Sequence, residues 1–265
     1  MSVNKSHYPL AGITVIDLSH IFNGPYATFL MAMAGANIIK VEPFQGEHLR
    51  SRGDMGGAAL PFAMLNSNKK PVTLNLKTEK GRELLKEMVA RADILVENFA
   101  PGVMNRLGVG AEVLQKINPR LIYGSSSGYG TDGPYRDYPA MDLVMQAMCG
   151  VINSTGHPDQ PPVKSGAALC DFLAGIHLYG ALMTALYDVP RPGWPVWWKS
   201  RCRTPPMPRS PPTSACSMRV VPKRRSAPAT VTVDWVFRPI TSTRQATVMW
   251  CSTHRVITTS APSSR

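Results

Sequence analysis

The sequence predicts an α/β fold: a Rossmann-like, mostly parallel sheet with helices on both faces. Two observations indicate it. Short β-branched apolar runs alternate with helical segments, and a polar or glycine-rich stretch follows each run. Strands that alternate with helices favour a parallel sheet, because each connecting helix returns across one face. Ligands of such a sheet bind at the carboxyl ends of its strands.

The first elements form a βαβ unit. Residues 13–18 (ITVIDL) predict a strand, and Pro25 can open a helix that Gly35 ends. Residues 37–42 (NIIKVE) predict the next strand. This unit starts the sheet.

The remaining elements continue the alternation. Thr78 is expected to cap a helix whose apolar residues share one face. In chain order we expect a strand at 72–77, that helix to about Arg91, a strand at 94–98, short helices at 101–107 and 110–117, a strand at 121–127, a helix near 141–149 and an apolar helix from Phe172 to about Tyr187.

Residues 190–265 differ from the rest in composition. From residue 191 onward the chain carries 13 of its 29 Lys and Arg residues, one acid (Asp234), all five Trp and no Leu. The net charge of +12 therefore belongs to this stretch. We expect one domain over residues 1–189 and a disordered basic tail, rich in Pro, Arg, Ser, Thr and Trp, over 190–265.

Composition also bounds the functional class. The five cysteines include no C-x-x-C pair, so neither a zinc site nor a disulfide framework is expected. The sequence shows no signal peptide and no run of 18 apolar residues, which predicts a cytoplasmic protein without a membrane partner. Nucleic acid is not an expected partner; a tail that binds it through its Trp and basic residues is the less favoured alternative.

A G-x-G-x-x-G string at residues 128–133 (GYGTDG) resembles a dinucleotide-binding motif but stands in the wrong structural context. In a dinucleotide site this string opens a helix, but here Pro134 and Pro139 predict a continuing loop. Nicotinamide binding is therefore not expected.

Seven strings stand in one order along residues 10–189: PLAGITVIDLSH, GP, GANIIKVEPFQGE, NSNKKPVTLNLK, ADILVENFAPGVMNRLG, NPRLIYGSSSGYGTDGPY and SGAALCDFLAGIHLYGALMTAL. They resemble the ordered blocks of family III coenzyme A transferases, the group that contains formyl-CoA and carnitine CoA transferases. The resemblance implies the family's large domain, a homodimer, acyl-CoA and carboxylic acid substrates, and no tightly bound cofactor.

The resemblance also implies a nucleophile, Asp171. Its carboxylate would attack the acyl-CoA carbonyl to form a mixed anhydride, and CoA would return to give an aspartyl-CoA thioester before the acceptor acid takes it. A carboxylate suits this chemistry because one difficult exchange is divided into smaller steps. By residue type alone, an Asp before an apolar helix is more often an N-cap.

The resemblance places further residues at the CoA site: Phe22, Asn23, Leu74, Asn75, Lys77, Asn98, Phe99, Arg106 and Met141. By residue type alone, Phe99 is more often a core residue and Arg106 a solvated helix charge. Phe22 and Asn23 replace the Gln-Ala of formyl-CoA transferases, and Pro43 replaces a basic residue. These departures argue against formyl-CoA and oxalate as the substrate pair.

Two alternatives stay open. The α-methylacyl-CoA racemase branch resembles the same scaffold but needs a second acid/base group, a histidine whose place Met141 takes here. Since Met141 cannot accept a proton, the transferase is preferred, and His177 is expected to pack within its helix. The other alternative is a catalytically dead remnant that binds CoA.

The end of the resemblance predicts a shifted reading frame before Arg191. Codons for residues 197–205 (WWKSRCRTP), read at a one-base offset, permit V-E-V-S-M-Q-D-A, which resembles the family's next block. The same offset at residues 226–237 permits R-T-G-N-R-H-G-G-L-G, a second such block. A frameshift implies a truncated chain that lacks the family's second domain, with turnover reduced or lost.

Overall fold

The computed structural model describes residues 8–52, 54–55, 58–130, 133–157, 159–188, 219–221 and 230–234. Within these ranges the chain forms one large sheet flanked by helices, and a small hairpin of β3 (Asp54–Met55) and β4 (Ala58–Ala59). The predicted α/β class is therefore confirmed.

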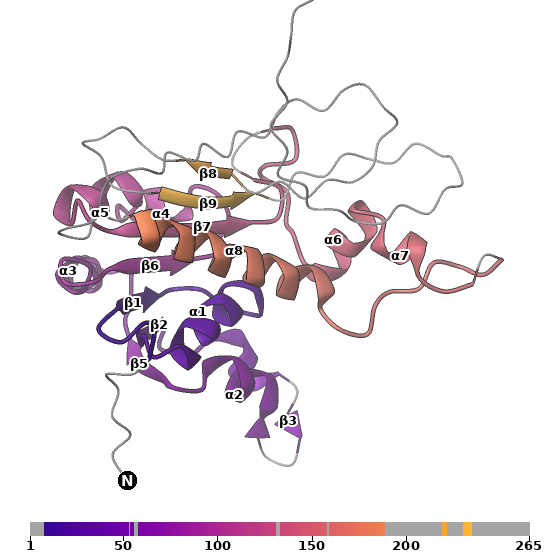
Figure 1. Cartoon of the computed structure of the whole chain (residues 1–265), viewed down its shortest axis with the longest axis horizontal. Helices are drawn as coiled ribbons and strands as arrows, with labels where there is room; N and C mark the ends of the chain where they lie inside the picture. Colours follow the sequence, from indigo (N-terminus) through magenta and orange to yellow (C-terminus); the bar gives the residue numbers. More distant parts are fainter. Residues whose placement is uncertain are drawn as a thin grey trace, which may run out of the picture.

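The large sheet has the strand order β5-β2-β1-β6-β7-β9-β8 (Figure 1). Its parallel members are β1 (Thr14–Asp17), β2 (Asn37–Glu42), β5 (Lys69–Thr73), β6 (Ile94–Glu97), β7 (Ile122–Ser127) and β9 (Thr230–Asp234). β8 (Arg219–Val221) pairs antiparallel with β9. The carboxyl ends of β1, β6 and β7 therefore meet at one edge, where a ligand site is expected.

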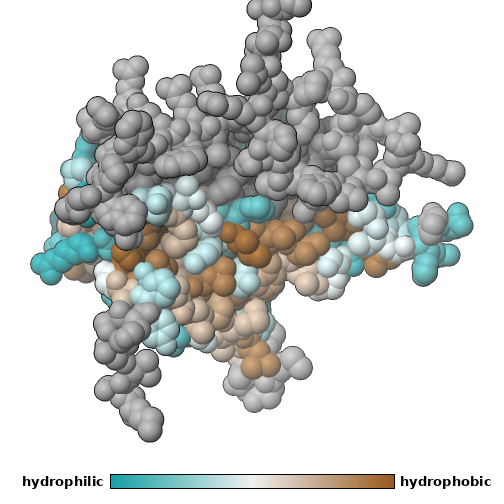
Figure 2. Space-filling model, viewed as in Figure 1, coloured by the Kyte–Doolittle hydropathy of each residue, from teal (hydrophilic) through white to brown (hydrophobic). Residues whose placement is uncertain are grey.

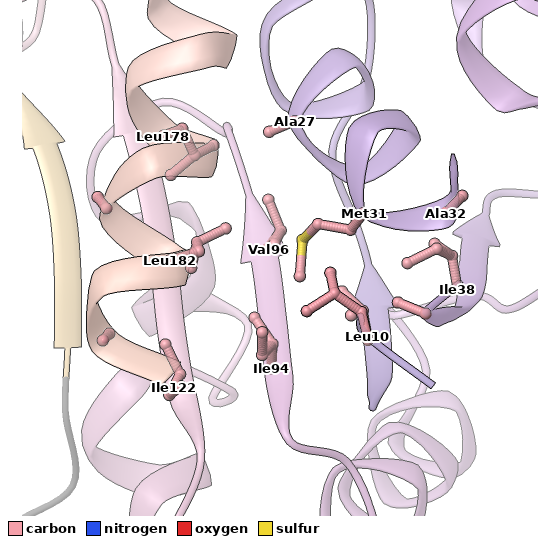
Figure 3. Close-up of a cluster of buried hydrophobic side chains, with 14 residues drawn as sticks. Leu10, Ala27, Met31, Ala32, Ile38, Ile94, Val96, Ile122, Leu178 and Leu182 are labelled. Carbon is pink, nitrogen blue, oxygen red and sulfur yellow. The ribbon is translucent and has the colours of Figure 1, made fainter. Parts of the chain in front are cut away.

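Helices α1 (Asn23–Met33) and α8 (Leu169–Asp188) cover one face of the sheet, in front in Figure 1. Side chains from both helices and from β1, β2, β6 and β7 form a buried cluster (Figure 3). Met31, Ile94, Leu178 and Leu182 are fully buried within it. This packing fixes α8 against the central strands.

The other face carries α3 (Glu79–Val89), α4 (Val103–Arg106) and α5 (Ala111–Ile117). Leu85, Leu95 and Leu114 are fully buried in a second cluster there. Thr78 caps α3 as predicted, since its hydroxyl accepts a hydrogen bond from the backbone N–H of Gly81. The central strands are thus buried on both faces, which explains their continuous apolar sequences.

The remaining elements lie around this core. They are a 3-10 helix (His48–Ser51), α2 (Leu60–Asn66), α6 (Asp142–Met148) and α7 (Val151–Ser154). Among these only α6 was expected from the sequence.

The bounds of one predicted strand were wrong. The third strand was expected at 72–77, but the paired residues of β5 are Lys69–Thr73, beside Ile38–Glu42 of β2. β5 is an edge strand, where Pro71 is tolerated because its missing N–H faces no neighbour. Leu74 to Lys77 instead leave the sheet and turn into α3, and the Asn75 side chain accepts a hydrogen bond from the Lys77 N–H.

α8 is, by length and composition alone, apolar enough to cross a membrane. A core helix passes the same test, and one side of α8 packs into the cluster of Figure 3. Its other side exposes Ile176, and Figure 2 shows apolar side chains on the face that carries α1 and α8.

Two segments of the stretch expected to be disordered form strands, β8 and β9. The first four residues of β9 (TVTVD) are all β-branched, which favours its pairing with β7. The rest of residues 190–265, and the boundary expected at 189, lie outside the described residues.

Candidate active site

Two cavities lie at the carboxyl edge of the sheet. The smaller one, of about 80 Å³, is enclosed by the N-terminus of α1, the loops after β6 and β7, and α6 and α8. It is lined by Asn23, Asn98, Ser126, Ser127, Gly128, Ala140, Met145, Cys170, Asp171 and Ala174. The structure therefore brings three predicted site residues together: Asn23, Asn98 and Asp171.

Asp171 is the third residue of α8, at the helix end that reaches this edge (Figure 1). Burial raises the pKa of its carboxyl to about 7, and the nearby Asp142 carboxylate adds to the rise. In the part of the chain that the structure describes, no hydrogen-bond donor satisfies this carboxylate. Near pH 7 Asp171 is therefore about half ionised, and its ionised form is a partly buried carboxylate, which is a condition that favours attack on a carbonyl carbon.

The cap of α8 is supplied by Asp142, not by Asp171. Asp142 Oδ1 accepts hydrogen bonds from the backbone N–H groups of Cys170 at 2.9 Å and of Asp171 at 3.1 Å. Its Oδ2 accepts one from Gln146 Nε2 at 2.6 Å. Buried Gln146 also accepts a hydrogen bond from the Ser165 N–H, which ties the preceding loop to α6. The Asp171 side chain thereby remains available for chemistry.

Glycine permits the close approach of α8 to α1. A Cβ added at Gly175 would lie 2.6 Å from the carbonyl oxygen of Asn23. Gly128 plays the same part for the loop before α6, because an added Cβ would lie 1.9 Å from the Cβ of Ala140. The size of the smaller cavity depends on both approaches.

The larger cavity, of about 450 Å³, lies beside the first, and Ser127 lines both. It is bounded by the loop after β6, by α4 and by Arg136 and Asp137. Two predicted residues, Phe99 and Arg106, line it, and so does Arg136. Two guanidinium groups beside an open cavity can bind phosphate.

Glu97, the last residue of β6, holds the loop after this strand through hydrogen bonds. Its carboxylate accepts hydrogen bonds from the Phe99 N–H at 2.8 Å and from the hydroxyl groups of Tyr123 and Ser125. Burial raises the pKa of Glu97 to about 6, against the lowering effect of these hydrogen bonds. Glu97 therefore orders the wall that the two cavities share.

The side chain of Asn98 joins two loops. It accepts a hydrogen bond from the backbone N–H of His20 and donates one to the carbonyl of His20, each at 2.9 Å. The ring of His20 lies 5.3 Å from that of Phe99 between centroids. Burial lowers the pKa of His20 to about 4, and the charge of Lys40 lowers it further, so this ring is neutral at pH 7.

A buried charge cluster supports the loop after β1. Lys69 Nζ lies 3.0 Å from Asp17 Oδ2, and Thr28 donates a hydrogen bond to the same oxygen. Burial acts to raise the pKa of Asp17, but Lys40 and Lys69 outweigh it and hold this pKa well below the usual range. Lys40 also donates a hydrogen bond to the carbonyl of Ser19, so the cluster fixes the loop that leads to Asn23.

Five predicted CoA-site residues line neither cavity. The ring of Phe22 packs 5.7 Å from that of Phe172, Leu74 is buried in the second core cluster, and Met141 is 64% exposed before α6. Asn75 and Lys77 lie in the turn before α3. Their assignment to the CoA site stays a prediction.

Sequence reasoning missed four residues here: Ser126, Ser127, Asp142 and Arg136. The serines end a buried strand, which was a visible signal, but serine is common there for many reasons. Asp142 and Arg136 stand in polar loops, and only the folded chain shows what they face. Among the described residues, no group of His, Cys, Asp or Glu could hold a metal ion.

Comparison with known proteins finds one family and several of its members. A family model described as CoA-transferase family III matches residues 10–194. An acetyl-CoA:oxalate CoA-transferase of Acetobacter aceti is 46% identical over 71% of this chain and 49% of its own length. A formyl-CoA:oxalate CoA-transferase of Streptomyces avermitilis is 44% identical over 68% of this chain and 44% of its own.

Solved structures show the same likeness. A CAIB/BAIF family protein from Brucella suis superposes with a TM-score of 0.65 at 38% identity, over 68% of this chain and 49% of that one. Rv3272 from Mycobacterium tuberculosis gives a TM-score of 0.66 at 34% identity, over 70% and 53%. The chain spans about half the length of the curated relatives it matches.

Proposed function

We propose a function for this chain, which belongs to CoA-transferase family III. It moves coenzyme A from an acyl-CoA thioester to a carboxylic acid through Asp171. One observation carries the proposal. Asp171 lines a small cavity with no donor to its carboxylate in the described residues, and a larger cavity with two arginines lies beside it.

In the first step, a carboxylate oxygen of Asp171 attacks the thioester carbonyl carbon and forms a C–O bond. The carbonyl electron pair moves to oxygen, and when it returns the C–S bond breaks and CoA leaves as a thiolate. This thiolate then attacks the Asp171 carbonyl carbon of the mixed anhydride and expels the donor acid as its carboxylate.

CoA then passes from Asp171 to the acceptor acid by the reverse sequence of steps. The acceptor carboxylate attacks the aspartyl-CoA thioester and expels CoA thiolate, which attacks the acceptor carbonyl of the new anhydride and releases Asp171. Each step exchanges one anion for another, so no general acid or base is required. No histidine is among the described residues that line the smaller cavity, which agrees with this chemistry.

The larger cavity is the proposed CoA site. Arg106 and Arg136 are the candidates to bind the phosphates, and Phe99 lines the path toward Ser127 and the smaller cavity. CoA would be a substrate and not a resident cofactor. The named activities of the relatives make acetyl-CoA and oxalate the first pair to assay.

The racemase alternative gains no support from the site. Met141 is 64% exposed, lines neither cavity and has no basic atom. A transferase needs only the carboxylate of Asp171.

Three further expectations stay proposals: a homodimer, a cytoplasmic location, and a frameshift as the origin of residues 190–265. Sequencing of the locus tests the last. An in-frame gene that encodes this tail, without an extra or missing base against its relatives, would exclude the frameshift.

The experiment that tests the function measures a covalent adduct. The full chain is incubated with acetyl-CoA, and its intact mass and peptide map are measured after rapid quenching. An acetyl or CoA adduct on Asp171, absent from Asp171→Ala, is the expected result. Equilibrium binding of CoA by both proteins separates the alternatives, because a dead remnant would bind CoA without forming any adduct.

A further inference from the structure

Three buried polar atoms around the smaller cavity have no hydrogen-bond partner among the described residues. They are Asn23 Oδ1, Ser126 Oγ and Ser127 Oγ. Ser126 is 1% exposed and Asn23 is 9% exposed. Buried polar groups nearly always have hydrogen-bond partners. Three atoms without one at the same cavity therefore indicate a ligand that supplies the missing hydrogen bonds.

The strand geometry brings both serines to this cavity. Ile122 and Gly124 of β7 face α8, and side chains alternate along a strand, so Ser126 faces α8 too. Ser127 is the last residue of β7 and lines both cavities. An acyl group that enters from the larger cavity would therefore pass Ser127 and meet Ser126 near Asp171.

The chemistry of the lining indicates what is bound. No Lys or Arg lines the smaller cavity in the described part of the chain, so a positive side chain does not supply the counter-charge there. Two hydrogen bonds to the backbone of His20 hold the Asn98 amide, one through its oxygen and one through its nitrogen. The lining side chains whose buried oxygens have no partner in the described residues are the two serines and Asn23, and each can donate a hydrogen bond, because the amide oxygen and nitrogen of Asn23 exchange places by rotation.

We propose that Ser126 and Ser127, together with Asn23, form the subsite that holds the acyl oxygen of the group transferred at Asp171. The inference rests on the proposed function. When Asp171 attacks the thioester, the carbonyl oxygen becomes an oxyanion, and preorganised neutral donors in a buried site stabilise it. The subsite takes an acyl group with a carbonyl or carboxylate oxygen, and its volume of about 80 Å³ suits a short one.

The test compares Ser126→Ala and Ser127→Ala with the unmodified full chain. The rate of adduct formation from acetyl-CoA should fall about 10- to 100-fold in each variant. Ser126→Thr, which keeps a hydroxyl, should recover most of the rate. The control is Ser154→Ala, which removes an exposed hydroxyl that donates a hydrogen bond to the carbonyl of Val151 and should leave the rate unchanged.

Thermal stability separates this role from a structural one. A serine that holds the fold together loses a partner when it becomes alanine, so the melting temperature falls. A buried hydroxyl without a partner carries a desolvation cost that alanine removes, so here the melting temperature should hold or rise. Adduct formation at the unmodified rate in both alanine variants would overturn the proposal, and so would rate loss that only accompanies a lower melting temperature.

A binding measurement keeps the inference testable if the proposed function fails. In an Asp171→Ala background, which forms no adduct, the ratio of the Kd of CoA to the Kd of acetyl-CoA reports the acyl subsite alone. The two serine variants should lower this ratio about two- to fivefold, because the carbonyl oxygen loses a donor. An unchanged ratio would overturn the subsite, whether or not the unmodified chain turns over.

Discussion

Asp142 holds the backbone of Asp171 with a hydrogen bond of 3.1 Å to its N–H and at the same time raises the pKa of its side chain. One carboxylate thus positions the proposed nucleophile and weakens its acidity. The two effects separate experimentally, because an amide oxygen can accept the two backbone hydrogen bonds of Asp142 Oδ1 without the charge, while the hydrogen bond from Gln146 to Oδ2 is lost.

Activity should follow the ionisation of Asp171. In the proposed mechanism only the carboxylate form attacks, and the pKa of about 7 places the midpoint of its ionisation near neutral pH. We expect kcat/KM for acyl-CoA to rise about tenfold per pH unit below 7 and to level off above 8. A pH profile of the adduct rate measures it, and a profile flat from pH 5 to 9 would contradict it.

Asp142→Asn should shift that midpoint to lower pH. Burial, the larger cause, remains, so the pKa of Asp171 should stay above its ordinary value. Glu83→Gln on the exposed face of α3 is the control, and its profile should match that of the unmodified chain. An unmoved midpoint in Asp142→Asn would show that the charge of Asp142 does not act on Asp171.

Asp171→Asn should stabilise the fold at alkaline pH. The pKa of Asp171 is about 7 in the folded state against an ordinary 3.8, so between these values the folded chain holds a proton that the unfolded chain has released. The free energy of unfolding therefore falls as pH rises through this window, and the asparagine variant escapes the fall. We expect a gain of about 2 kcal/mol at pH 8, reduced by the partial exposure of the carboxyl, and none at pH 4. Urea unfolding at both pH values measures it.

The sequence predicted most of the sheet because its strands are buried on both faces. β1, β2 and β6 are short runs rich in β-branched and apolar residues, β7 begins as one before its three serines, and the bounds of all four agree with the expected ones to within a residue or two. The start of β5 was not predicted, because its burial is partial and its sequence KKPVT contains two lysines and a proline. Lysines at the start of a strand indicate exposure, and only the folded chain shows that Lys69 pairs with Asp17, 52 positions away in the sequence.

The site was less predictable than the fold. Asp171 was found through the block that surrounds it, since an aspartate before an apolar helix otherwise indicates a cap. The structure assigns that cap to Asp142. The unpartnered state of Ser126 and Ser127 depends on what lies around them in space, which no spacing in the sequence reports.

Gly175→Ala should separate α8 from α1. The added Cβ would lie 2.6 Å from the Asn23 carbonyl oxygen and 3.2 Å from the Cβ of Tyr26, neither of which can yield without moving α1. We expect a loss of about 1 to 3 kcal/mol in unfolding free energy, and a slower adduct rate.

Gly180→Ala is the matched control on the same helix. Its added Cβ meets nothing within 4 Å, so the lower entropy of the unfolded chain should stabilise the protein by about 0.5 to 1 kcal/mol. Equal effects of the two substitutions would contradict the close approach at Gly175.

Lys69→Met should destabilise the fold strongly. The lysine side chain is 1% exposed, and its removal leaves Asp17, which is fully buried, with only the more distant Lys40 at 4.0 Å as a counter-charge. Breaking one partner of a buried pair costs about 3 to 5 kcal/mol. Lys80→Met, which breaks the exposed pair with Glu83, should cost less than about 0.5 kcal/mol. Urea denaturation of both variants measures the difference, and comparable losses would mean that the buried cluster does not hold the loop that leads to Asn23.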